Sequence, residues 1–127
     1  MSYSIKNLAD VEDAAAAHGM GDTNASRFPR TDIDAEQVGL AHHTLRTGKR
    51  FPFGHRHQNA EEVHLVIRGS GRAKLDDEIV ELSENDVLRV SPEVMRSFEA
   101  GPDGLEYVVF GTRHEGDGEM DPEFWKD

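Results

Sequence analysis

The sequence predicts an all-β protein, a barrel or jelly roll of short strands with one short helix near the N-terminus. Two observations support this fold class. From about residue 36, apolar and polar side chains alternate in short runs, as they do on strands that bury one face. Turn-forming Gly, Pro, Asn and Asp residues separate these runs about every eight to twelve residues, a spacing typical of sandwiches, barrels and jelly rolls. The chain has no internal repeat and no linker, so we expect one domain.

Composition narrows the classes of function. The 127 residues suffice for one domain with a modest core. A formal net charge of −11 argues against nucleic acid and anionic membrane surfaces as partners, because both are bound through excess Lys and Arg. The absence of cysteine excludes disulfides and thiol nucleophiles. No apolar run approaches the roughly 18 residues of a membrane span, and no signal peptide is apparent, so we expect a cytoplasmic protein.

Residues 1–35 are predicted to be a peripheral extension that carries the helix. Asp10 is placed to cap the helix, and four alanines at positions 14–17 favour its propagation. Gly19 is a natural stop at the C-terminal end.

The predicted barrel spans residues 36–112. Residues 113–127 form an acidic tail, expected to be loose apart from an aromatic anchor at Phe124 and Trp125. Glycine, proline and paired Asn or Asp residues mark the turns, among them 69–71 and 101–104. The predicted strands cover residues 37–45, 61–68, 72–75, 78–81, 87–90, 95–100 and 105–111.

Alternation is clearest from residue 61 to residue 68. Because side chains on a strand point alternately to its two faces, Glu62 and His64 are predicted to share the inward face. On the preceding strand one of His42 and His43 must also face inward, and the pattern does not distinguish them.

Three residues have the side chains and spacing of a metal site. His55 and His57 are separated by one residue, so on an extended chain both point to the same face. Glu62 follows at the start of the next strand. Two imidazoles and one carboxylate can hold a divalent transition metal such as Fe, Mn, Ni or Zn while leaving coordination positions open. The alternative is a metal-free barrel in which the three side chains hydrogen-bond one another.

From about residue 36 to residue 112 the chain resembles the cupin family. The first cupin motif is a glycine, then His-x-His, three or four residues, Glu, six residues and Gly. His55, His57, Glu62 and Gly69 match it, and Gly48 approximates the leading glycine, one residue too far from His55. The resemblance implies a double-stranded β-helix with a small-molecule site inside the barrel mouth. Because the family is often dimeric, it also implies a homodimer.

The second cupin motif is kept only in outline. It is normally a Gly-Asp turn, a strand, Pro-x-Gly, then a His and later an Asn. Here Asn85 and Asp86 make the turn, Ser91–Pro92–Glu93 stands in place of Pro-x-Gly, Arg96 replaces the His and Ala100 the Asn. Cupins include isomerases, dioxygenases, decarboxylases, seed-storage proteins and sensory domains, so the fold alone does not assign a function.

Arg96 decides how the site is interpreted. A guanidinium stays protonated, cannot serve as an ordinary ligand and repels a nearby dication. It is expected either to pair bidentately with Glu62 or to anchor a carboxylate or phosphate of a ligand. His64 is interpreted as a proton carrier, a substitute metal ligand or a neutral interior histidine.

Two functional hypotheses follow. In the first, His55, His57 and Glu62 hold the metal of an isomerase or dioxygenase that acts on a small acidic organic molecule, with His64 and Arg96 as catalytic residues. In the second, Arg96 pairs with Glu62, and the protein is a metal-free binding, structural or regulatory cupin without turnover.

Overall fold

The computed structural model describes residues 2–112 and 114–126, and it is almost entirely β. Two short helical turns precede the strands: a 3-10 turn η1 (Leu8–Asp10) and a helix α1 (Ala14–Ala17). The strands are β1 (Asn24–Arg27), β2 (Val38–Leu45), β3 (Gly54–His57), β4 (Glu62–Leu75), β5 (Glu78–Leu82), β6 (Val87–Val90), β7 (Arg96–Thr112) and β8 (Gly118–Asp121). The predicted all-β class and the short N-terminal helix are confirmed.

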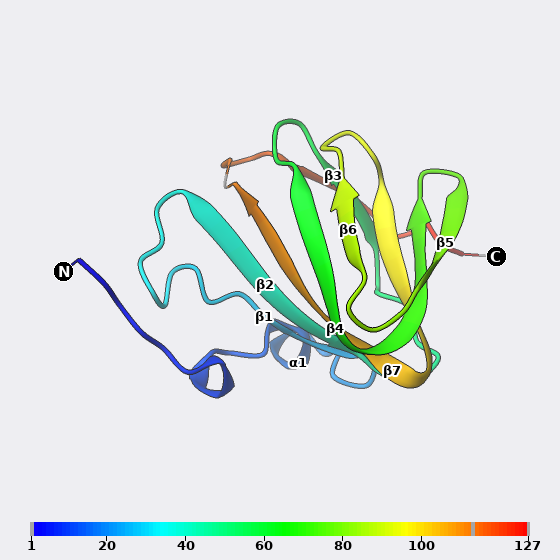
Figure 1. Ribbon diagram of the computed structural model, residues 1–127, viewed down its shortest axis with the longest axis horizontal. Helices are drawn as coiled ribbons and strands as arrows, with labels where there is room; N and C mark the ends of the chain where they lie inside the picture. Colours follow the sequence, from blue (N-terminus) through cyan, green and yellow to red (C-terminus); the bar gives the residue numbers. More distant parts are fainter. Residues whose placement is uncertain (1, 113, 127) are drawn as a thin grey trace.

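The strands form one curled antiparallel sheet built around β4 and β7. These two long strands pair from Glu62 opposite Gly111 to Leu75 opposite Arg96. β2 and β3 flank β7, while β5 and β6 pair with β4. In Figure 1, β4 runs down the sheet beside β7 and then curves into the hairpin with β5. This winding of paired strands is the double-stranded β-helix that the cupin resemblance implied.

Two predicted turns are instead bends inside long strands. β4 runs through residues 69–71, and β7 runs through residues 101–104, where the sequence favoured chain reversals. The pairing register shifts on either side of Gly69, which has a φ of 83°. A side chain at Gly69 would collide with the carbonyl of Gly104, and one at Gly71 with the carbonyl of Glu99. The glycines therefore allow two bent strands to approach each other rather than ending them.

The helix begins later than predicted. Asp13, not Asp10, is the N-cap of α1, and its carboxylate accepts hydrogen bonds from the amides of Ala15 and Ala16. The same oxygen accepts a hydrogen bond of 2.9 Å from the Ser26 amide on β1. Because this tie to the sheet requires the carboxylate at position 13, tertiary contact selects Asp13 over Asp10, which the local sequence favoured.

The core lies between the curled halves of the sheet and continues into a polar cluster. Its buried apolar residues are Leu45, Val66, Ala73, Leu82, Phe98, Ala100, Leu105, Tyr107 and Val109. The His64 ring packs against two of them, with centroids 5.0 Å from Phe98 and 6.2 Å from Tyr107. The core therefore forms the floor beneath the predicted site.

The C-terminal segment, expected to be loose, adds strand β8 to the sheet. β8 pairs with β3 from Gly54 opposite Asp121 to His57 opposite Gly118. The aromatic anchor is present: Arg50 lies 4.8 Å from the centroid of the Trp125 ring, and Lys74 Nζ lies 4.5 Å from that of Phe124. Neither helical segment among the described residues is long and apolar enough to cross a membrane.

Candidate metal centre

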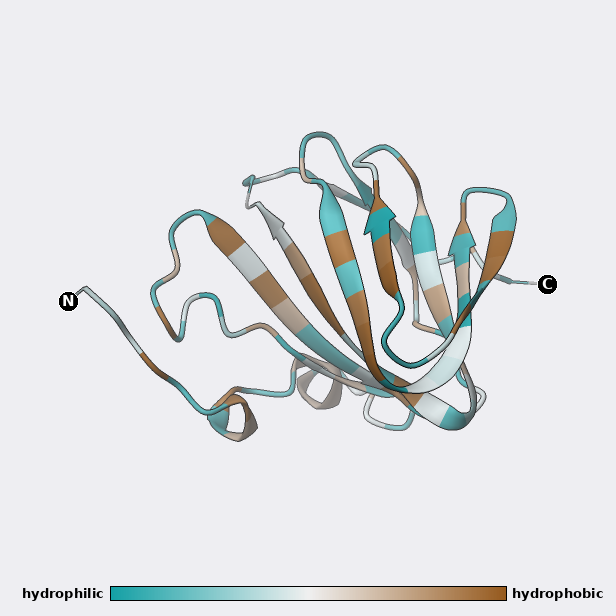
Figure 2. Ribbon diagram, viewed as in Figure 1, coloured by the Kyte–Doolittle hydropathy of each residue, from teal (hydrophilic) through white to brown (hydrophobic). Residues whose placement is uncertain are grey.

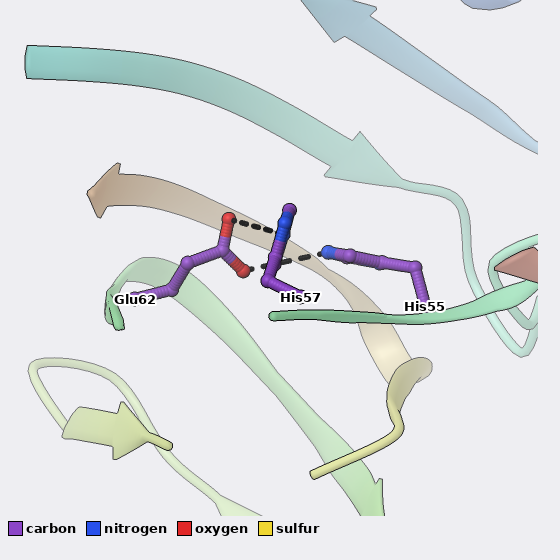
Figure 3. A group of neighbouring side chains, drawn as sticks. All are labelled: His55, His57 and Glu62. Atoms are coloured by element: carbon purple, nitrogen blue, oxygen red, sulfur yellow. Dashed lines mark hydrogen bonds and ion pairs between the residues drawn. The ribbon is translucent and has the colours of Figure 1, made fainter. Parts of the chain in front are cut away.

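The three predicted metal ligands meet where β3 ends and β4 begins (Figure 3). His55 and His57 project from the same face of β3, and Glu62 is the first residue of β4. One ligand atom of each lies within 4.8 Å of the other two. His55 Nε2 lies 3.4 Å from Glu62 Oε1, and His57 Nε2 lies 3.3 Å from Glu62 Oε2. The geometry thus brings together all three residues that the sequence singled out.

The spacing and the unpaired nitrogens fit a metal ion. Metal–nitrogen and metal–oxygen bonds of about 2.1 Å place neighbouring ligand atoms roughly 3.0–3.4 Å apart, as seen between Glu62 and the two histidines. Both ring nitrogens of His57 are buried and form no hydrogen bond. Since buried polar atoms normally have partners, His57 Nε2 is available to an ion beside the Glu62 carboxylate.

Arg96 approaches Glu62 from the interior side. It begins β7 opposite His55 and is fully buried. Its Nη1 lies 3.3 Å from Glu62 Oε1, whereas Nη2 donates to the carbonyls of Ser91 (2.7 Å) and Pro92 (3.4 Å). The predicted pair of Arg96 and Glu62 is therefore present, but it uses one nitrogen and is not bidentate, because the other terminal nitrogen is bound to the backbone.

Glu62 is held as a carboxylate. Burial alone would raise its pKa, but the hydrogen bond with His55 and the close approach of the His57 ring outweigh that effect and hold the pKa well below its usual range. Oε1 faces His55, Arg96 and, at 3.8 Å, His64 Nε2; Oε2 faces His57. Oε1 is thus surrounded by Arg96 and two histidines, whereas Oε2 faces His57.

The interior histidines are neutral. His64 is almost fully buried, and burial lowers its pKa to about 4, with the neighbouring Arg96 charge acting in the same direction and Glu62 opposing it. His43, rather than His42, is the histidine of β2 that faces inward; burial lowers its pKa to about 3. Its Nδ1 lies 2.7 Å from Ser26 Oγ, whereas His42 Nε2 contacts Glu106 Oε2 at 2.7 Å.

An open cavity of about 390 Å³ lies over the candidate ligands, and a neighbouring one of about 290 Å³ continues it. His57, Glu62 and Phe28 line both. Arg96 and His64 line neither; they face a separate interior space of about 20 Å³. The predicted metal ligands therefore face the mouth of the barrel, and the two residues predicted to be catalytic lie behind them.

A family model described as the AraC-like ligand binding domain matches residues 27–116. The chain belongs to this family. No curated protein matches it. Among solved structures, a cupin protein from Bacteroides fragilis shares 20% identity over 91% of this chain and 88% of its own, with a TM-score of 0.73. A sugar phosphate isomerase of the cupin superfamily from Silicibacter pomeroyi shares 18% identity, with coverages of 92% and 81% and a TM-score of 0.72.

A third similar structure is oxalate decarboxylase from Bacillus subtilis. It shares 18% identity over 92% of this chain but only 32% of its own, with a TM-score of 0.69. Identities this low establish the fold and not the reaction. The chain is a small cupin, as the His55, His57, Glu62 and Gly69 spacing predicted.

In this cupin one site residue, Asp117, was missed from the sequence. Its buried carboxylate accepts hydrogen bonds of 2.9–3.1 Å from the backbone amides of residues 58–60. One of its oxygens lies 3.4 Å from His57 Nδ1. These backbone hydrogen bonds outweigh burial and lower the pKa of Asp117. The Gly-Asp-Gly triplet at 116–118 signals a turn with a carboxylate that binds backbone, but its partners lie about 58 residues earlier.

Asp117 holds the loop that joins the two parts of the candidate site. The loop 58–61 runs from His57 to Glu62, and its amides converge on this one carboxylate. A carboxylate beside the second ring nitrogen of a metal-binding histidine fixes the orientation and tautomer of the ring. Asp117 is therefore placed to aim His57 Nε2 at Glu62.

Proposed function

We propose that this cupin binds a small organic molecule in the barrel mouth, next to a divalent transition metal held by His55, His57 and Glu62. The convergence of their ligand atoms within 4.8 Å carries the proposal, because these atoms border the open cavities. Fe, Mn, Ni and Zn are all compatible with two imidazoles and a carboxylate.

When bound, such a metal supplies Lewis-acid chemistry toward an oxygen of the ligand. Three side chains of the protein orient the ligands and move protons in this proposal. Arg96 keeps Glu62 oriented and ionised from the interior side, and Asp117 orients His57. His64, whose Nε2 lies 3.8 Å from Glu62 Oε1, is the imidazole outside the three ligands that would carry a proton in this scheme. An enzyme built on this arrangement is a metal-dependent isomerase or dioxygenase.

A second candidate is a metal-free binding module, and Arg96 is the observation that favours it. The Arg96 guanidinium, 3.3 Å from Glu62 Oε1, already supplies the positive charge that a metal would otherwise bring to this carboxylate. A dication beside it is opposed by charge repulsion. In that function the mouth binds its ligand without turnover.

Metal content separates the two candidates. Protein purified without chelator, then incubated in turn with Fe, Mn, Ni and Zn and desalted, is expected to retain about one metal per chain in elemental analysis. His57→Ala should abolish retention, whereas His18→Ala is a matched control because His18 is exposed and lines neither cavity of the mouth. Substoichiometric metal in all four incubations would exclude the metal site and leave the binding module.

We also propose that the protein is a homodimer in the cytoplasm, as the sequence and its resemblance led us to expect. In support, the adjacent strands β2, β7, β4 and β6 carry exposed apolar residues, and apolar positions appear as brown bands along the ribbon in Figure 2. The exposed ones are Val38, Ile67, Val87 and Phe110. A contiguous exposed apolar face is typical of an interaction surface. A monomer mass in multi-angle light scattering would refute the dimer, and cell fractionation tests the location.

A further inference from the structure

We propose that the ligand of the mouth is a small carboxylate, and that Arg30 binds its carboxylate group at the rim. This inference rests on the proposed function only in that the ligand occupies the cavity over His57 and Glu62. It does not require a metal.

Arg30 is held in place, but none of the described residues supplies a partner for its charge. It lies in the turn before β2, where its carbonyl accepts a hydrogen bond of 3.0 Å from the Ala35 amide. Its side chain is half-buried and lines the cavity of about 390 Å³. Its Nε is buried without a hydrogen-bond partner. In residues 2–112 and 114–126, no carboxylate forms an ion pair with it, including the nearby Asp32 and Asp34.

A guanidinium that lines a cavity and has no ion-pair partner among the described residues suits an anionic acceptor that enters the cavity. Buried polar groups are nearly always hydrogen-bonded, and leaving one unsatisfied is costly. A guanidinium binds a planar carboxylate through two parallel hydrogen bonds. Because the chain carries a net charge of −11, general attraction cannot bring an anion to this cavity, and a local cation must do so.

The charge balance of the mouth points to the same residue. Glu62 is the carboxylate among the described residues that line the cavity, and His55, His57 and Arg96 surround it. Arg96, the alternative ligand anchor of the sequence analysis, directs both terminal nitrogens at Glu62 and backbone carbonyls and lies outside the cavity. Arg30 is therefore the uncompensated cation that faces the ligand space.

The other residues that line the cavity indicate what kind of skeleton the ligand has. Phe28, Leu40, Ala41 and Val109 offer apolar surface between Arg30 and the His57 end of the cavity. A cavity of about 390 Å³ is at the small end of the range of ligand sites. The ligand class is thus a small organic acid with a short apolar or partly apolar skeleton, whose far end reaches His57 and Glu62.

The test compares carboxylates with their neutral amides on metal-free protein. Benzoate and hexanoate are titrated against benzamide and hexanamide while amide signals of the ¹⁵N-labelled protein are followed by NMR. The wild type is expected to bind each carboxylate about tenfold more tightly than its amide, because only the carboxylate makes charge-assisted bonds to the guanidinium. The shifted signals should come from the Arg30 turn and β2.

Three variants assign the preference to Arg30. Arg30→Gln should bind carboxylate and amide equally, while Arg30→Lys should keep a reduced preference. Arg89→Gln is the matched control, because Arg89 is exposed, pairs with Glu61 and lies outside the mouth. The NMR spectrum of each variant also shows whether it is folded. Absence of a carboxylate preference in the wild type, failure of all four probes to bind at tens of millimolar, or a preference that survives in Arg30→Gln would overturn the inference.

The outcome is separable from that of the metal experiment. Loss of the metal proposal with an Arg30-dependent carboxylate preference leaves the anion site standing. Metal retention without any carboxylate preference removes the anion site and leaves the metal centre.

Discussion

Arg96 in the barrel interior and Arg30 at the mouth carry the same guanidinium in opposite settings. Arg96 is fully buried, donates to backbone carbonyls and faces Glu62 at 3.3 Å. Arg30 is half-buried, lines an open cavity and forms no ion pair with a carboxylate of the described residues; the Nε of each arginine is buried without a partner. The interior region has its charges balanced from within the chain, whereas the mouth leaves one to be balanced by a ligand. The role of each arginine thus depends on whether residues of the chain already neutralise its charge and accept its hydrogen bonds.

Removing the interior arginine gives the largest expected effect. Arg96→Ala leaves the buried Glu62 carboxylate without its guanidinium, and breaking a buried ion pair typically costs about 3–5 kcal/mol of unfolding free energy. Urea denaturation measures the loss. Arg89→Ala, which removes an exposed arginine of an ion pair, should change stability by less than about 1 kcal/mol. Similar losses in the two variants would show that Arg96 does not balance Glu62.

Replacing Arg96 by histidine, the residue of the usual cupin motif, tests whether the charge in the interior opposes a metal. Arg96→His removes the charge that repels a dication and offers a fourth nitrogen to the metal. Affinity for Zn or Ni, measured by isothermal titration calorimetry, is expected to rise at least about tenfold.

Arg96→Gln is the control for that gain, since it removes the charge without adding a metal ligand. A rise shared equally by both variants would assign the effect to charge alone. No rise in either would mean that His55, His57 and Glu62 are not arranged as ligands.

On the mouth side, Asp117 gives the smallest expected change. Asp117→Asn keeps the size of the side chain but weakens its hold on residues 58–60 and on His57 Nδ1. Loss of such a supporting carboxylate typically lowers metal affinity about tenfold, which calorimetry can resolve. Glu119→Gln, two residues further along in β8, exposed and paired with Arg56, should leave affinity unchanged. Equal affinities in the wild type and Asp117→Asn would remove Asp117 from the site.

Local patterns predicted those parts of the site that depend on neighbours along the chain. The His55–His57 spacing and the alternation from Glu62 to His64 require only that two strands form, and both did. The same patterns could not choose between His42 and His43, because that choice depends on the register of β2 against β7. Glycines near positions 69 and 104 were interpreted as turns, since the close approach of β4 to β7 is a contact between distant segments.

The features missed altogether depend on partners far along the chain or on the lack of a partner. β8 is mostly exposed and acidic, and it forms a strand because it pairs with β3, not because it has an apolar pattern. Asp117 matters because its acceptors meet a distant loop. That Arg30 lacks a carboxylate partner is a property of the whole fold, and no motif encodes it.

The pairing of β3 also has a consequence for the order in which the protein folds. β3 shares one residue pair with β7 but four with β8, and His57 pairs with Gly118, roughly sixty residues further along. During synthesis from the N-terminus, the long β4–β7 pair can therefore assemble before the histidine strand has its principal neighbour. The amides of the loop before Glu62 likewise lack their acceptor until Asp117 has been synthesised. The segment of Asp117 and β8 supplies none of the three candidate ligands. Its synthesis nevertheless determines when a nascent chain can first complete the proposed metal site.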